Sequence, residues 1–176
     1  MPQREEKRGE LVKLVNSGYS DPAERNPLMR LLYRNWHPTH FGQFVNRLNC
    51  WWSGLGLPPK IQAVLEVKGR TSGRTRSTPV AIATVEGKQY LVSILGVQSN
   101  WVRNVGSAHG EATIRQGRRR RVHLVPVPPK ERAPILQEYV RIAPSGRQHF
   151  PLPVGAALSE FAVIAERYPV FRIDPL

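Results

Sequence analysis

Between residues 61 and 127 the chain consists of short apolar segments joined by tight turns, and this pattern most restricts the fold. In residues 61–68, apolar and mostly polar side chains alternate with the two-residue period of a strand that buries one face. Turns at Gly87 and Gly117 suit hairpins. Strands are predicted at residues 61–68, 78–85, 89–95, 112–116, 121–127 and 170–173. Because most neighbouring strands are joined by hairpins, the sequence predicts a mostly β fold with peripheral helices (α+β). The sheet is expected to be largely antiparallel, open or closed into a small barrel.

Helices are predicted around these strands. Residues 130–142 and 157–167 have helical spacing, although Pro134 is placed awkwardly inside the first of them. Ser99 can cap a short helix that runs through Trp101. The expected helices therefore lie between and around the strands.

The first third of the chain has a different character. Residues 1–27 are polar and irregular, whereas residues 28–52 place apolar and aromatic side chains at helical spacing among arginines and histidines, with Pro38 dividing the segment. A basic, aromatic amphipathic helix can lie on a membrane surface or pack across its own domain, and the sequence leaves both open. We predict an N-terminal tail and amphipathic helical region over residues 1–54 and a β domain over residues 55–176.

A formal net charge of +13 on 176 residues restricts the partners of the chain. Such a charge attracts nucleic acid, an anionic membrane surface or a polyanionic small molecule, and it argues against a cationic substrate. The single cysteine, Cys50, excludes an intramolecular disulfide and a multi-cysteine metal site, and the histidines lack metal-site spacing. The charged first residues lead into no apolar segment, and no window approaches the roughly 18 apolar residues of a spanning helix. We therefore expect a cytoplasmic protein without a metal.

The loop after the first predicted strand reads Lys68-Gly69-Arg70-Thr71-Ser72-Gly73-Arg74-Thr75-Arg76. Its two glycines allow a tight bend and close approach of backbone N–H groups to a ligand, and its arginines can each bond two oxygens of a phosphate or carboxylate. The spacing is neither that of a P-loop nor that of a dinucleotide-binding fingerprint, because the loop joins strand to strand. The composition favours a site for an anionic cofactor, and the alternative is a solvated hairpin turn.

Two further segments have an ambiguous reading. The arginine run of residues 115–121 suggests nucleic-acid binding, but it contains no aromatic side chain for base stacking, and a solvated hairpin tip is the alternative. Residues 99–104 open a helix and contain an aromatic side chain, an arginine and two amides. Free N–H groups at a helix start favour an anion, whereas Trp101 can equally be a core residue.

Taken together, these residues resemble the deazaflavin-dependent nitroreductase family. The resemblance is carried by a strand leading into residues 69–76 and Pro79, then by Tyr90-Leu91-Val92-Ser93 followed by Ser99-Asn100-Trp101-Val102-Arg103-Asn104. The ending Tyr168-Pro169-Val170-Phe171-Arg172-Ile173 is similar to the closing strand of the family. The resemblance covers residues 61–173.

The resemblance implies a split β-barrel that binds the 8-hydroxy-5-deazaflavin coenzyme, with the loop on its phosphate and acidic tail and the later segments beside its ring. The implied cofactor-binding residues are Lys68, Gly69, Arg70, Thr71, Ser72, Gly73, Arg74, Arg76, Pro79, Ser93, Ile94, Leu95, Ser99, Trp101 and Asn104. The chain departs from the family at Thr71, where a lysine is common, and Lys68 is the candidate substitute.

The resemblance also implies a chemistry, in which the reduced coenzyme gives a hydride to a small electron-poor acceptor such as a quinone, a nitro compound or an activated alkene. Tyr139 and His149, the latter in the irregular residues 143–153, are the candidate catalytic residues of the acceptor pocket, with packing as the alternative role of Tyr139. We expect a monomer or homodimer that does not bind nucleic acid, with peripheral contact to the inner membrane face through residues 28–52 as a further expectation. The rival hypotheses are a flavin mononucleotide (FMN) reductase on the same fold, a basic nucleic-acid-binding module, and a coenzyme carrier without catalysis.

Overall fold

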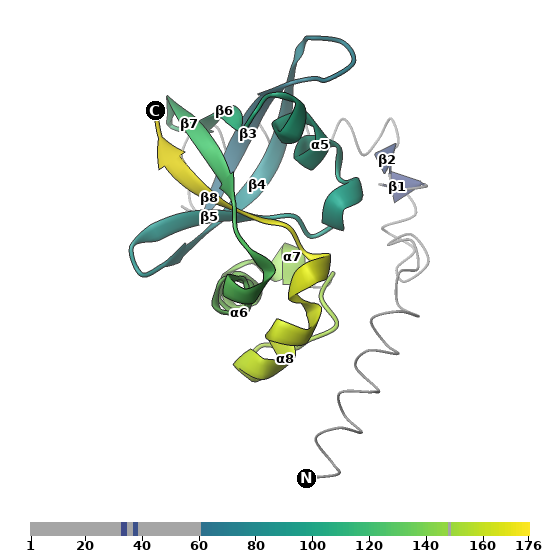
Figure 1. The fold of residues 1–176 in the computed structure, drawn as a ribbon, viewed down its shortest axis with the longest axis vertical. Coiled ribbons are helices and arrows are strands. Elements are labelled where there is room, and N and C mark those ends of the chain that lie inside the picture. Colours follow the sequence, from purple (N-terminus) through teal and green to yellow (C-terminus); the bar gives the residue numbers. More distant parts are fainter. Residues whose placement is uncertain (1–32, 35–36, 39–60, 148) are drawn as a thin grey trace.

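Six strands form a closed antiparallel barrel (Figure 1). The computed structural model describes residues 33–34, 37–38, 61–147 and 149–176, and the last two ranges contain the barrel. The order around the barrel is β3-β4-β5-β8-β7-β6, and β6 pairs back onto β3. The strands are β3 (Gln62–Lys68), β4 (Thr75–Val85), β5 (Lys88–Val92), β6 (Glu111–Gln116), β7 (Arg118–Pro126) and β8 (Val170–Pro175). The predicted mostly β, antiparallel fold is confirmed, although β4 and β7 begin earlier than expected and β5 ends before Leu95.

Two short strands precede the barrel. β1 (Tyr33–Arg34) pairs antiparallel with β2 (His37–Pro38), so these four residues form strands inside the segment of residues 28–52 for which the sequence predicts helices divided at Pro38. The rest of residues 1–60 lies outside the described residues, so the amphipathic helices and their membrane contact stay predictions. No helix in the described part of the chain is long and apolar enough to cross a membrane.

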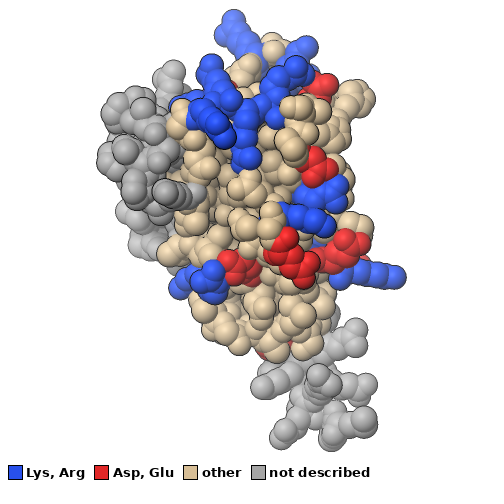
Figure 2. All heavy atoms as spheres, turned by 90° about the vertical axis from the view of Figure 1, so that its left-hand side faces the viewer, with Lys and Arg blue, Asp and Glu red and all other residues tan. Residues whose placement is uncertain are grey.

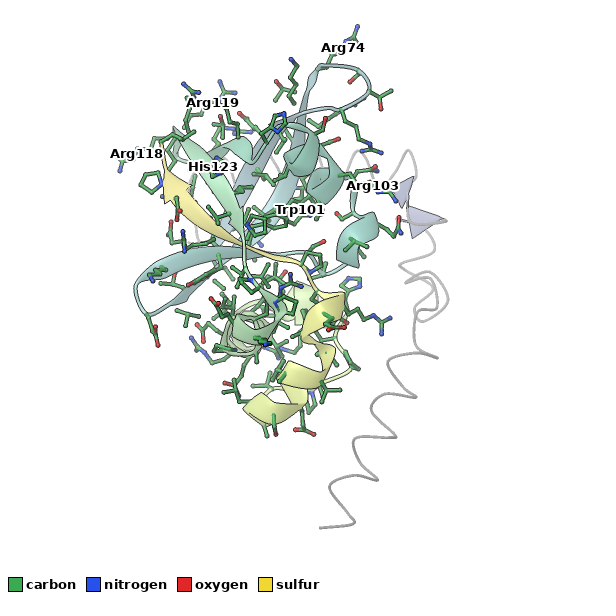
Figure 3. All side chains as sticks on the ribbon, viewed as in Figure 1. Arg74, Trp101, Arg103, Arg118, Arg119 and His123 are labelled. Carbon is green, nitrogen blue, oxygen red and sulfur yellow. The ribbon has the colours of Figure 1, made fainter. Side chains whose placement is uncertain are left out.

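The interior of the barrel is closed by α5 (Asn100–Ser107), which follows the short helix η1 (Gly96–Gln98). Trp101 and Val105, one turn apart on α5, are buried with the inward side chains of the strands. The ring of Trp101 lies 5.4 Å from that of Phe171 on β8, and Figure 3 shows it between the strands. Trp101 is therefore a core residue, and it fixes α5 to the barrel. Ser99 takes the predicted N-cap position, but its side chain makes no capping hydrogen bond.

A second core lies outside the barrel, where one helix packs on β4 and β5 and two further helices pack on that helix (Figure 1). They are α6 (Ala133–Ile142), α7 (Pro144–Arg147) and α8 (Leu158–Ile164), flanked by the short helices η2 (Pro129–Glu131) and η3 (Ala165–Arg167). The sequence predicts one helix over residues 130–142, but the structure divides it, so that Pro134 lies in the first turn of α6. A proline is tolerated there because its missing N–H has no partner within the helix. α7 corrects the expectation that residues 143–153 are wholly irregular.

The outer face of β3 is also buried, contrary to the predicted half-buried strand. Val64 is fully buried and Glu66 is only 9% exposed. The carboxylate of Glu66 accepts a hydrogen bond from Nε–H of Arg115 at 3.0 Å, and it lies 3.3 Å from Nε of Arg119. Because two guanidinium groups compensate its charge, the carboxylate can be buried without an unpaired anion.

Candidate functional site

Residues 69–74 form the β3–β4 loop, which joins two strands as the sequence predicts. The N–H of Gly69 donates to the carbonyl of Arg74 at 2.9 Å, and the N–H of Gly73 donates to the carbonyl of Gly69 at 2.8 Å. Gly73 has a φ of 65°, a conformation that costs other residues roughly 1–2 kcal/mol. A Cβ atom on Gly69 would lie 3.0 Å from the carbonyl oxygen of Arg74. Both glycines are therefore required by the shape of the loop.

Hydrogen bonds from Arg70 to α5, which we call the Arg70 bridge, hold this loop on the helix. The Oδ1 atom of Asn104 accepts the backbone N–H of Arg70 at 3.3 Å and its Nη1 group at 3.0 Å. The Nη2 group of Arg70 donates to Oδ1 of Asn100 at 3.2 Å. The guanidinium of Arg70 is thus shared between two helix side chains, and it connects the loop to the helix that closes the barrel.

The spacing from Trp101 to Asn104 explains how α5 can both fill the interior of the barrel and hold the β3–β4 loop. Residues three apart on a helix are neighbours on its surface. Trp101 enters the barrel, and Asn104, which is 5% exposed, meets the loop at the edge of the same buried face. Asn100 also belongs to this arrangement, although it is absent from the predicted site residues. The only sequence signal for Asn100 is its position in residues 99–104, next to Trp101.

Three cations of the loop region remain available to a ligand. Lys68, Arg74 and Arg76 are exposed, and their side chains form no hydrogen bond or ion pair with other described residues. Figure 3 shows Arg74 projecting from the far end of the loop. The hydroxyl-bearing Thr71 and Ser72 are exposed beside them. This donor set, rich in positive charge and hydroxyl groups, suits an anionic group.

The remaining predicted cofactor residues form the connection between β5 and α5, apart from Pro79, which pairs with Val64 within the sheet. Ser93 is fully buried, and its hydroxyl donates to the carbonyl of Gly96 at 2.8 Å. Ile94 packs against the helical core, and Leu95 and Ser99 are partly exposed. The hydroxyl of Ser93 therefore stabilises the turn that leads into α5.

Sequence comparison places this barrel and its loop in a known family. A model of the F420H(2)-dependent quinone reductase family matches residues 40–151, well over half of the chain. The chain belongs to this family. Its resemblance to deazaflavin-dependent reductases is thereby confirmed, and family membership supports an oxidoreductase that uses the deazaflavin coenzyme F420. No curated protein matches the chain significantly.

Several solved structures have a similar fold at low sequence identity. An F420-H2 dependent reductase (FDR-A) is 15% identical, with a TM-score of 0.45 over 65% of this chain and 95% of that chain. A putative 5-nitroimidazole antibiotic resistance protein from Bacteroides thetaiotaomicron is 10% identical, with a TM-score of 0.44 over 65% of this chain and 72% of that chain. A heme binding protein from Mycobacterium smegmatis is 11% identical, with a TM-score of 0.43 over 69% of this chain and 49% of that chain.

In this F420H(2)-dependent quinone reductase family member, the two predicted catalytic residues do not join the loop. Tyr139 lies on α6, 5% exposed in the helical core, with its ring 5.8 Å from that of Phe150. His149 follows α7, and its carbonyl accepts the hydroxyl of Tyr168 at 3.0 Å. Figure 1 shows α6 and α7 on the side of the barrel away from the β3–β4 loop. The packing role that the sequence left open for Tyr139 is the one that its contacts support.

Burial of Tyr139 predicts a loss of stability at high pH. Desolvation raises the pKa of the Tyr139 hydroxyl to about 12, above the ordinary value of about 10. The raised pKa means that its stabilising contribution is complete below pH 10 and is lost as the pH rises toward 12. We expect the wild type to lose about 2–3 kcal/mol more than Tyr139→Phe between these values. Urea unfolding across this range measures the difference, and parallel curves would contradict the prediction.

Proposed function

We propose that this protein reduces a quinone with the reduced deazaflavin coenzyme F420, held at the β3–β4 loop. The observation that carries the proposal is the loop itself, an ordered turn with three exposed cations beside α5, within a chain of the F420H(2)-dependent quinone reductase family. The hydrogen-bond donors of the loop fit the anionic part of F420. The coenzyme carries a phosphodiester and carboxylates, and the loop offers guanidinium, ammonium, hydroxyl and amide donors.

The loop residues would have two roles, binding the coenzyme and positioning the loop. Arg74 and Arg76, with Lys68, would bind the anionic part of the coenzyme, and the hydroxyls of Thr71 and Ser72 would add neutral hydrogen bonds. Arg70 would act as a positioning residue, because its guanidinium already donates to Asn104 and Asn100. The family resemblance, in contrast, gives Arg70 the same coenzyme-binding role as Arg74 and Arg76.

The chemistry would come from the coenzyme and its placement from the protein. The bound reduced coenzyme supplies a hydride, which together with one proton converts a quinone into a hydroquinone. The β5–α5 connection would stand beside the ring, where the buried Ser93 hydroxyl fixes the turn through Gly96. Trp101 would act indirectly, because it anchors α5 inside the barrel. Nitro compounds and activated alkenes are the further acceptors that this proposal includes.

The test is a fluorescence titration with oxidised F420, run beside FMN and followed by turnover with a water-soluble quinone. We expect F420 to bind in preference to FMN. Arg74→Ala/Arg76→Ala should raise the Kd of F420 about five- to twenty-fold, because two charge-assisted interactions are lost and solvent weakens each of them at these exposed side chains. Lys88→Ala/Lys130→Ala is the matched control, since it also removes two exposed cations and both lysines lie outside the loop.

Three results would contradict the proposal. An unchanged Kd in the double variant would remove the loop from the coenzyme site. Binding of F420 without quinone reduction would instead indicate a carrier of the coenzyme, and a preference for FMN would indicate a flavin reductase.

A further inference from the structure

The positive charge of the described β domain is concentrated in two segments. Residues 61–176 contain 17 Lys and Arg and eight Asp and Glu, a surplus of nine positive charges. Residues 66–76 and 111–121 together contain nine of these cations and only two of the carboxylates, so they hold seven of the nine surplus charges. Outside these two segments the domain is close to neutral.

Strand pairing places the two segments next to each other. β3 pairs with β4 on one side and with β6 on the other, and β6 continues into β7 through the arginine hairpin (residues 115–121). Figure 2 shows Lys and Arg gathered on the upper part of the molecule, and Figure 3 shows Arg118 and Arg119 on the side of the barrel away from α5. The two segments therefore form one basic half of the barrel, opposite α6, α7 and α8.

The carboxylates of this half leave most of its arginines uncompensated. Glu66 pairs with both Arg115 and Arg119, and Glu111 lies 3.7 Å from Arg121, which is 73% exposed. The side chain of Arg118 is exposed and forms no hydrogen bond or ion pair with other described residues. The arginine hairpin therefore presents a net positive charge to the solvent.

The tip of the arginine hairpin is too far from the β3–β4 loop to complete it by contact. The side chain of Gln116 donates to the carbonyl of Gln62, at the start of β3, whereas the loop begins after Lys68 at its end. Six residues of strand separate these points by roughly 20 Å. A field acts over this distance at low ionic strength, where the Debye length reaches about 30 Å at 0.01 M.

We propose that the arginine hairpin steers the anionic coenzyme electrostatically toward the β3–β4 loop, raising its association rate without contacting it in the bound state. The inference rests on the proposed function, since it takes the coenzyme as the anion. Clustered charge of one sign accelerates the association of an oppositely charged ligand by 10- to 1000-fold, and the effect falls with salt. The two segments contain no aromatic side chain, so they lack the stacking surface of a single-strand nucleic-acid site.

The test is stopped-flow fluorescence of oxidised F420 binding to the full chain at several salt concentrations. Arg118→Gln/Arg121→Gln removes two hairpin charges and leaves both partners of Glu66 in place. Lys88→Gln/Lys130→Gln is the matched control, because it removes two exposed charges outside the basic segments. We expect the hairpin variant to lower the association rate constant about three- to ten-fold at low salt, with the dissociation rate constant unchanged. The difference should vanish near 0.5 M salt, and the control should stay near wild type.

Three results would overturn the inference while leaving the proposed function intact. These are an unchanged association rate, an equal decrease in the control variant, or a faster dissociation that shows direct contact. A short DNA duplex and vesicles containing anionic lipid are titrated in parallel. If the hairpin variant loses affinity for either of them while its F420 association rate is unchanged, the hairpin serves that partner instead. Absence of F420 binding to the wild type would overturn the proposed function and the steering with it.

Discussion

Replacing Asn104 with alanine is expected to weaken F420 binding about ten- to a hundred-fold. Asn104 is buried, and its single Oδ1 atom accepts both the backbone N–H and the Nη1 group of Arg70. Hydrogen bonds to a charged group contribute about 1.5–3 kcal/mol, and about 1.4 kcal/mol corresponds to a tenfold change in Kd. Without this acceptor the loop loses its fixed position on α5, so binding must order it again.

The control for this prediction separates the acceptor from the rest of the side chain. Asn104→Asp keeps the Oδ1 atom and adds a negative charge beside Arg70, so it should retain the Arg70 bridge and near-wild-type binding. Fluorescence titrations of Asn104→Ala, Arg70→Ala and the double variant then form a thermodynamic cycle. If Arg70 acts through Asn104, the double variant should be little worse than either single one. Additive losses would show that Arg70 binds the coenzyme independently of Asn104.

The fold could be predicted because its signals are local. The alternation in β3 and the glycine turns at Gly87 and Gly117 each involve neighbouring residues, and they specify hairpins irrespective of the rest of the chain. The same local signal failed at Glu66, because a polar residue in an alternating strand is expected to face water. Its burial depends on Arg115 and Arg119, which lie far away in the sequence and come close only after β6 pairs with β3 and β7 pairs with β6.

The candidate site was predictable in composition and not in the roles of its residues. The glycines and arginines of the loop indicate an anion site, but the Arg70 bridge joins residues 34 positions apart. No periodicity or turn signal reports such a contact. For the same reason Asn100 was missed, and Arg70 was grouped with Arg74 although only Arg70 donates to α5. Tyr139 shows a second limit, since a tyrosine with a helical neighbourhood looks the same in sequence whether it lines a site or fills a core.

A substitution at Gly110 is expected to have the largest effect on stability, because this residue holds the junction between α5 and β6. Gly110 has a φ of 84°, its N–H donates to the carbonyl of Val105 at 2.9 Å, and its carbonyl accepts the N–H of Leu124 at 2.8 Å. A Cβ atom here would lie 2.8 Å from Cε1 of His123 and 3.0 Å from the carbonyl oxygen of Leu124. The imidazole can move, but the carbonyl belongs to β7 and cannot move without disturbing the barrel.

Gly110→Ala should therefore lower the free energy of unfolding by about 2–5 kcal/mol, the sum of a left-handed backbone cost and an overpacking cost. Gly155→Ala is the matched control, because Gly155 has a φ of 88° and no atom within 4 Å of its added Cβ. It should lose only the backbone part, roughly 1–2 kcal/mol. Urea unfolding of both variants measures the difference. Equal losses would mean that Leu124 and His123 yield to the methyl group, and that the attachment of α5 to the barrel is softer than its contacts indicate.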